Sequence, residues 1–127
     1  MEKVRSLPFV AAGGAAGAGA RYGALELVGE ADRLLAIWAI NLVGSLLLGV
    51  FVGLRLTRRG TERITRNQFD LLGFGFCGAF TTFSTFALDV ARRLEDGELQ
   101  TALLVGLATP LTAVLVAGFG YRMGSRP

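Results

Sequence analysis

The residues whose types and spacing could do chemistry gather in one run, residues 80–86, at the centre of an 18-residue stretch without charges, residues 71–88. The run interleaves hydroxyl side chains with aromatic rings: Thr81, Thr82, Ser84, Thr85, Phe80, Phe83 and Phe86. Hydroxyls can restore backbone hydrogen bonds lost at a helix break, and they can also bond back to the i−4 carbonyl of an intact helix. The run therefore leaves two interpretations open. It is either a broken helix whose freed carbonyls bind a cation, or a continuous helix.

The two phenylalanines at the end of the run are three residues apart, so in a helix they lie on one face. A phenylalanine stripe usually faces lipid or the protein core. Aromatic rings also carry a positive edge, so Phe83 and Phe86 could attract an anion without offering it a full charge.

Asn41 is the only asparagine within any of the long charge-free stretches. A buried amide is costly without partners, so Asn41 either holds two helices together or donates an N–H to a passing anion. Ser45 follows one turn later. Arg21 is the only cation within a predicted span, and it either reaches the membrane interface or concentrates anions at a pore mouth.

Several chemistries are excluded. The chain has no histidine, which removes histidine-based metal sites and triads, and the single cysteine, Cys77, has no base beside it. Gly73, Gly75 and Gly78 match G-x-G-x-x-G, but no strand precedes them, so a dinucleotide site is rejected. We expect no enzyme activity.

The elements that must position these residues are membrane helices. Of 127 residues 52% are apolar and only 18% are charged, which is too much apolar surface for a small water-soluble domain. Spans need roughly 20 residues. The spacing of the charges predicts one all-α transmembrane domain, residues 1–127, with four helices at about 5–28, 34–54, 70–90 and 99–121.

Lysine and arginine are unevenly distributed between the two sides. The two termini and the 55–66 segment hold nine of them, against three in the opposite loops, which favours both termini in the cytoplasm. Three G-x-x-x-G pairs predict close helix packing: Gly13 with Gly17, Gly49 with Gly53, and Gly120 with Gly124. Four helices enclose little space, so a transport function needs an oligomer.

Pro110 lies at the centre of the predicted fourth helix, where it should kink the helix and free a carbonyl. Thr109 and Thr112 could satisfy that carbonyl or line a path.

Three motifs together resemble the fluoride channel family known as Fluc or CrcB. They are G-G-A-A-G-A-G-A-R-Y at residues 13–22, N-L-V-G-S-L-L-L-G at 41–49 and G-F-C-G-A-F-T-T-F-S-T-F at 75–86. They occur in the order and the size of chain that the family shows.

The resemblance implies an antiparallel, dual-topology dimer with two fluoride pores and a third helix broken at mid-membrane. It implies a central structural Na+ held by backbone carbonyls of Gly78 and Thr81 from both subunits. It also implies a role for each remaining motif position: Asn41, Phe83, Phe86, Ser84 and Thr85 line the pore, and Arg21 lies in the vestibule.

Two features depart from the family pattern. In the predicted fourth helix, the positions where the family often has a tyrosine and serines are occupied by Thr101, Val105 and Thr109. Which residues of this helix line the pore is therefore not determined by the sequence. The charge bias is also stronger than a dual-topology homodimer usually has. A homodimer and a heterodimer with an oppositely oriented paralogue therefore both remain.

The resulting expectation is passive fluoride export across the inner (plasma) membrane, which reduces cytoplasmic fluoride toxicity. One alternative is a proton-coupled exporter of the small multidrug type. That chemistry needs a deep carboxylate, and no charge-free stretch contains one. A second alternative is an assembly subunit that transports nothing.

Overall fold

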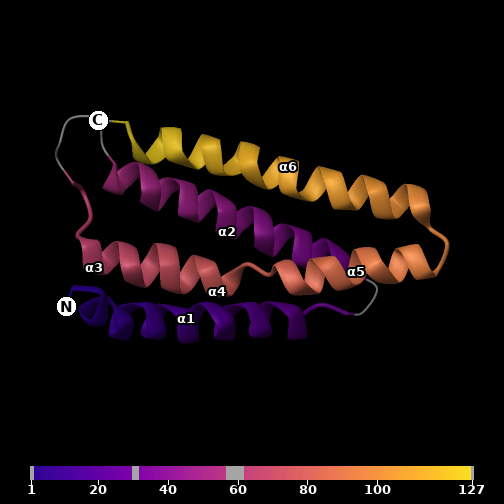
Figure 1. Cartoon of the computed structure of the whole chain (residues 1–127), viewed down its shortest axis with the longest axis horizontal. Helices are drawn as coiled ribbons and strands as arrows, with labels where there is room; N and C mark the ends of the chain where they lie inside the picture. The colour runs from indigo at the N-terminus through magenta and orange to yellow at the C-terminus, as the bar shows by residue number, and fades with distance from the viewer. Residues whose placement is uncertain (1, 30–31, 57–61, 127) are drawn as a thin grey trace.

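The computed structural model describes residues 2–29, 32–56 and 62–126, with side chains from residue 5 onward. Arg58, Arg59 and the side chain of Lys3, which contribute to the charge bias, lie outside the described residues. The secondary structure of the described part is helical: α1 (Glu2–Glu26), α2 (Arg33–Arg55), α3 (Arg66–Phe69), η2 (Asp70–Cys77), α4 (Gly78–Phe80), α5 (Phe83–Glu95) and α6 (Leu99–Gly124). The segments α3 to α5 follow one line, so the chain forms four helical rods side by side (Figure 1).

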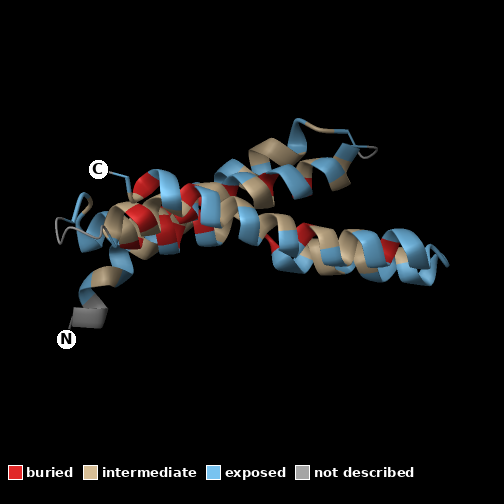
Figure 2. Cartoon of the chain, turned by 90° about the horizontal axis from the view of Figure 1, so that it is seen from above, coloured by how far each residue is buried: buried red, intermediate tan, exposed pale blue. Residues whose placement is uncertain are grey.

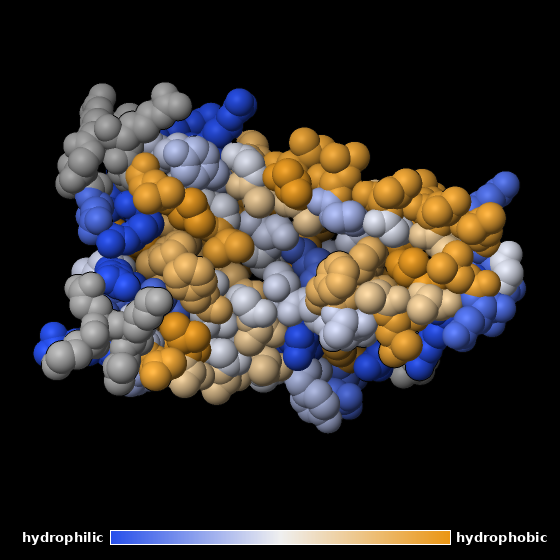
Figure 3. Space-filling model, in the orientation of Figure 1, coloured by the Kyte–Doolittle hydropathy of each residue, from blue (hydrophilic) through white to orange (hydrophobic). Residues whose placement is uncertain are grey.

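Three of the four rods are long and apolar enough to cross a membrane: Arg33–Arg55, Arg66–Glu95 and Leu99–Gly124. The remaining rod, α1, has 25 residues, but it is built largely of alanine and glycine and includes Arg21. Apolar side chains cover much of the visible face between two hydrophilic ends, as a membrane protein requires (Figure 3). The expected all-α architecture of four helices is therefore present, and three of the four are suited to cross a membrane.

Glycines set the packing between the rods. A Cβ atom on Gly13 or Gly17 of α1 would overlap the carbonyl oxygen of Leu71 or Phe76. The same overlap occurs between α2 and α6 for all four glycines of the other two pairs: Gly49, Gly53, Gly120 and Gly124. Backbones meet at each pair, so the prediction of close packing is confirmed for all three.

The third rod changes its helical geometry before it is interrupted. Its first half contains a π-helix, η2, in which Gly73, Gly75 and Cys77 are buried. The three glycines of the rejected G-x-G-x-x-G match thus lie in helical backbone, and Gly75 faces Val10 and Gly13 of α1.

The apolar core of a single chain is thin. Only Ile37, Ile40, Cys77 and Ala102 are buried hydrophobic residues within the described part of the chain. Figure 2 shows that the end of α1 and the start of α2 separate from α5 and the start of α6. An apolar groove of about 390 Å³ between these arms is lined by Leu34 and Trp38 from one arm and by Phe86 and Leu104 from the other.

Helix α6, which corresponds to the predicted fourth helix, runs without interruption through Pro110. The Thr112 hydroxyl donates to the carbonyl oxygens of Ala108 (2.8 Å) and Thr109 (2.9 Å). It therefore does not satisfy the Gly106 carbonyl, which lies four residues before the proline and loses its usual donor there.

Candidate functional site at a helix break

The third rod is interrupted for two residues in its middle. Thr81 (φ −73°, ψ 155°) and Thr82 (φ −141°, ψ 118°) are both extended, and the helix resumes at Phe83. Of the two interpretations that the sequence left open, the broken helix is therefore correct.

Asn41 of α2 hydrogen-bonds to the backbone of the interrupted segment. Its Nδ2 donates to the Thr82 carbonyl (3.1 Å), and its Oδ1 accepts from the Thr82 backbone N–H (2.8 Å). This pair of bonds replaces the ladder bonds that an extended residue cannot make within a helix. Asn41 thus joins two helices, and its amide still carries a second N–H donor beyond the one given to Thr82.

The bonds between Asn41 and Thr82 change which hydrogen-bond donors reach the nearby carbonyl oxygens. In a continuous helix the Thr82 N–H would bond to the Gly78 carbonyl, but here it is directed to Asn41. The Gly78 residue is exposed, with open space where a Cβ would lie. The Thr81 carbonyl accepts from Arg21 Nη1 at 3.2 Å, which leaves one of its two lone pairs.

Thr82 was missed as a site residue by the sequence reasoning. Its hydroxyl is the N-cap of α5, since Oγ1 accepts from the Thr85 backbone N–H (3.3 Å). The same Oγ1 donates to Thr85 Oγ1 (3.0 Å) and lies 3.5 Å from Ser84 Oγ. Threonine is a favoured N-cap residue, so a threonine directly before the resumed helix was the available signal.

The two phenylalanines after the break lie together, as predicted. The ring centroids of Phe83 and Phe86 are 5.8 Å apart, and the rings are tilted by 52°. Phe83 is 78% exposed, whereas Phe86 is half-buried. Both rings border a groove of about 330 Å³ that Asn41, Ser45, Thr81 and Thr82 also line.

The sequence did not determine which residues of α6 contribute to this groove. Thr109 and Ala113 line the groove, and Thr109 with Val105 lines a neighbouring apolar groove of about 390 Å³. Thr101 lines neither. Of the three residues with the family-like spacing, only Thr109 therefore borders the groove at the break.

No residue that lines the groove at the break is ionisable. The available groups are an amide, hydroxyls, backbone carbonyls and ring edges, supplied by the residues described above. Arg21 approaches the same break from α1 through its bond to Thr81. The groove lining itself offers donors and acceptors to a small ion without including a charged side chain.

A bundle of membrane helices with an unwound, uncharged segment in one of them is typical of proteins that pass small ions. The chain belongs to a family described as "CrcB-like protein, Camphor Resistance (CrcB)", whose model matches residues 8–121.

Curated relatives agree over nearly the whole length. The chain is 39% identical to "Fluoride-specific ion channel FluC 2" of Natronomonas pharaonis, with 91% of each protein covered. It is 41% identical to "Fluoride-specific ion channel FluC 1" of Rhodococcus jostii, over 96% of this chain and 87% of that protein. It is 37% identical to a Bacillus subtilis protein also named "Fluoride-specific ion channel FluC 2", over 98% of this chain and 89% of that protein.

Proposed function

We propose that this chain is a fluoride-selective channel that exports fluoride passively across the cytoplasmic membrane. The observation that carries the proposal is the groove at the helix break, where Asn41 and a hydroxyl cluster face Phe83 and Phe86. The names of the relatives support the choice of ion.

Fluoride is small and strongly hydrated, so its water can be removed only if other donors replace it. The second N–H of Asn41, the hydroxyls of Ser45 and Thr109, and the edges of the two rings can supply such donors. Ser84 and Thr85, which the resemblance places on the pore, do not line this groove. Because none of these donors is charged, the ion is not held too tightly to leave. The groove offers no carboxylate for proton coupling, so the small multidrug type of exporter gains no support.

Fluoride efflux from proteoliposomes tests the proposal. Vesicles that contain the purified chain should release fluoride, read with a fluoride electrode, and should release no chloride. Because two assemblies remain open, the assay is run with the chain alone and with a paralogue of opposite orientation. Absence of fluoride-selective efflux in both preparations would contradict the proposal.

Replacing Phe83 or Phe86 with isoleucine should slow fluoride efflux by about fivefold, since removing an aromatic edge forfeits on the order of 1 kcal/mol. Phe74→Ile is the matched control. It lies in η2 of the same rod and is exposed, and it lies outside the groove. Equal rates for all three variants and the unchanged protein would remove the two rings from the path.

We propose an antiparallel dimer in which α1 is the fourth span and Gly78 meets the partner. The exposed ring of Phe83 and the open space at Gly78 support a partner surface here. The partner is either a second copy of this chain inserted the other way, which gives a homodimer, or an oppositely oriented paralogue, for which the strong charge bias speaks. Labelling a C-terminal tag from each side of the membrane separates the two.

The carbonyls at the break fit a structural Na+. Gly78 has lost its regular donor, and Thr81 keeps one lone pair, so two subunits together would offer four oxygen ligands. When bound, the ion would neutralise converging carbonyl dipoles and join the subunits. The Arg21 bond to Thr81 holds that carbonyl in place from the other side.

Removal of Na+ should therefore lower the stability of the dimer. A ligand at about 100 times its dissociation constant stabilises by about 2.7 kcal/mol, which predicts a fall of several degrees in Tm when choline replaces Na+. Thermal unfolding in detergent measures this effect, with KCl as the second comparison. Identical Tm values in Na+, K+ and choline would argue against the ion.

A further inference from the structure

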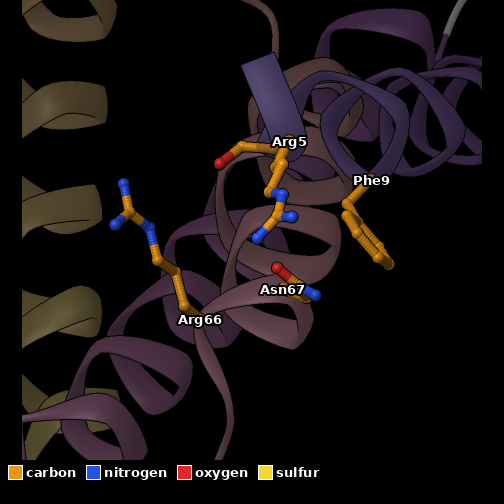
Figure 4. A pocket seen from close by; sticks show the side chains of 5 residues that line it. Arg5, Phe9, Arg66 and Asn67 are labelled. Carbon is orange, nitrogen blue, oxygen red and sulfur yellow. The ribbon is translucent and has the colours of Figure 1, made fainter. Parts of the chain in front are cut away.

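A second polar cavity lies far from the helix break, where the start of α1 meets the start of α3. It has a volume of about 460 Å³ and is lined by Arg5, Ser6, Phe9, Arg66 and Asn67. Figure 4 shows the side chains of Arg5 and Asn67 pointing toward each other from the two helices, with Phe9 on one side and Arg66 on the other. The described lining thus contains two guanidinium groups and no carboxylate.

The surroundings of this cavity are strongly basic. Figure 1 places the N-terminus, the start of α3 and the C-terminus at one end of the bundle. The described arginines at this end are Arg5, Arg55, Arg63, Arg66, Arg122 and Arg126. Two of these arginines bond to groups outside the cavity: Arg55 forms an ion pair with Glu62, and Arg63 donates to the Arg126 carbonyl at 2.9 Å. The membrane side rich in arginine is the side that anionic lipids attract.

The net charge of the side chains around the cavity would be balanced by a ligand with a single negative charge. Arg66 Nε lies 3.9 Å from Oδ2 of Asp70, a residue that is 6% exposed and lies behind the cavity rather than in its lining. That carboxylate offsets one guanidinium, and Arg5 has no acidic partner within the described residues. Counted over the described residues alone, one net positive charge remains, which equals the single negative charge of a phosphodiester.

The apolar side of the cavity points to a lipid rather than to a free anion. Phe9 follows Arg5 by four residues, so the two share one face of α1. Phe9 is 36% exposed, so its ring presents an apolar surface at the edge of the cavity. A headgroup held by Arg5 and Arg66 would place its acyl chain against this surface, whereas inorganic phosphate would gain nothing from it.

We propose that this cavity, which we call the basic cavity, binds the phosphodiester headgroup of an anionic phospholipid. The two guanidinium groups and the Asn67 amide donate to the phosphate oxygens, and Phe9 packs on the adjoining chain. The site is separate from the proposed fluoride path, because it shares no lining residue with the groove at the helix break.

Native mass spectrometry of the full-length protein tests the proposal with two lipids, phosphatidylglycerol and phosphatidylcholine. We expect phosphatidylglycerol to bind at least about fivefold more tightly, because each arginine near an anionic surface contributes about that factor. The preference should disappear in Arg5→Gln/Arg66→Gln. It should persist in Arg5→Lys/Arg66→Lys, which keeps the charges, and in Arg122→Gln, which removes an arginine from the same end but outside the cavity.

The single variant Arg5→Gln is the control for misfolding of the double variant, because within the described residues Arg5 has no ion pair to lose. It should weaken phosphatidylglycerol binding by about fivefold. Equal preference in Arg5→Gln, in the double variant and in the unchanged protein would overturn the proposal. Displacement of phosphatidylglycerol by millimolar inorganic phosphate would overturn the lipid as ligand and identify a free-anion site instead. Because the readout is lipid binding, a negative result leaves the fluoride assay unaffected.

Discussion

Replacing Asn41 with alanine should abolish fluoride efflux and destabilise the fold at the same time. The change removes both bonds to Thr82 and leaves a backbone N–H and a carbonyl without partners in a part-buried site. Each unsatisfied group costs about 1–3 kcal/mol, so the loss of stability should reach about 2–6 kcal/mol. Thermal unfolding and proteoliposome efflux measure the two effects.

Two comparisons separate the roles of Asn41. Val43→Ala, an exposed position two residues along α2, should leave both stability and efflux close to normal. Asn41→Asp keeps an acceptor for the Thr82 N–H but removes the donor, so it should retain part of the fold while losing efflux. Normal efflux in Asn41→Ala would mean that the bonds to Thr82 are dispensable.

Gly13→Ala and Gly17→Ala should each prevent α1 from docking correctly. The added methyl group would overlap the carbonyl oxygen of Leu71 or Phe76, and both are backbone atoms that cannot rotate away. Overpacking of this kind costs about 1–3 kcal/mol, and the shift of α1 should also move Arg21 away from the Thr81 carbonyl. We expect a lower Tm and strongly reduced efflux from each variant.

Gly19→Ala is the matched control on the same helix. Its Cβ would meet nothing within 4 Å, and alanine is the better helix former by about 1 kcal/mol. Its Tm should therefore equal or exceed that of the unchanged protein. If all three variants lowered the Tm alike, general glycine effects rather than the contact with the third rod would account for the loss.

The sequence located the segment where the helix breaks, because this signal is local, but the hydroxyl run by itself left a continuous helix open as well. Hydroxyls crowded at the centre of an apolar stretch, together with one amide in the same membrane layer at Asn41, are unfavourable unless they bond to exposed backbone. The structure joins these two features, since Asn41 bonds to Thr82. The sequence left the role of Asn41 open, because an asparagine can either join two helices or donate to an ion. The residue type alone does not distinguish these two roles.

Other parts of the site were not predictable, because they depend on how the rods align. Arg21 reaches Thr81 only in the alignment that Gly13 and Gly17 impose on α1, and nothing in a single helix fixes that alignment. The π-helix of residues Asp70–Cys77 was also missed. In a run such as D-L-L-G-F-G-F-C nearly every residue is apolar, so no periodicity distinguishes a wide turn from a regular one.

The interruption at Thr81 and Thr82 also gives the segment an internal polarity. The first half-helix ends at Phe80, where carbonyl oxygens leave a partial negative charge, and α5 begins at Phe83, where free N–H groups leave a partial positive charge. The negative end lies at Gly78 and Thr81, and the positive end lies beside the Phe83 and Phe86 rings. One unwound pair of residues thus provides fields of both signs from peptide dipoles alone, and neither field can be titrated away by a change in pH.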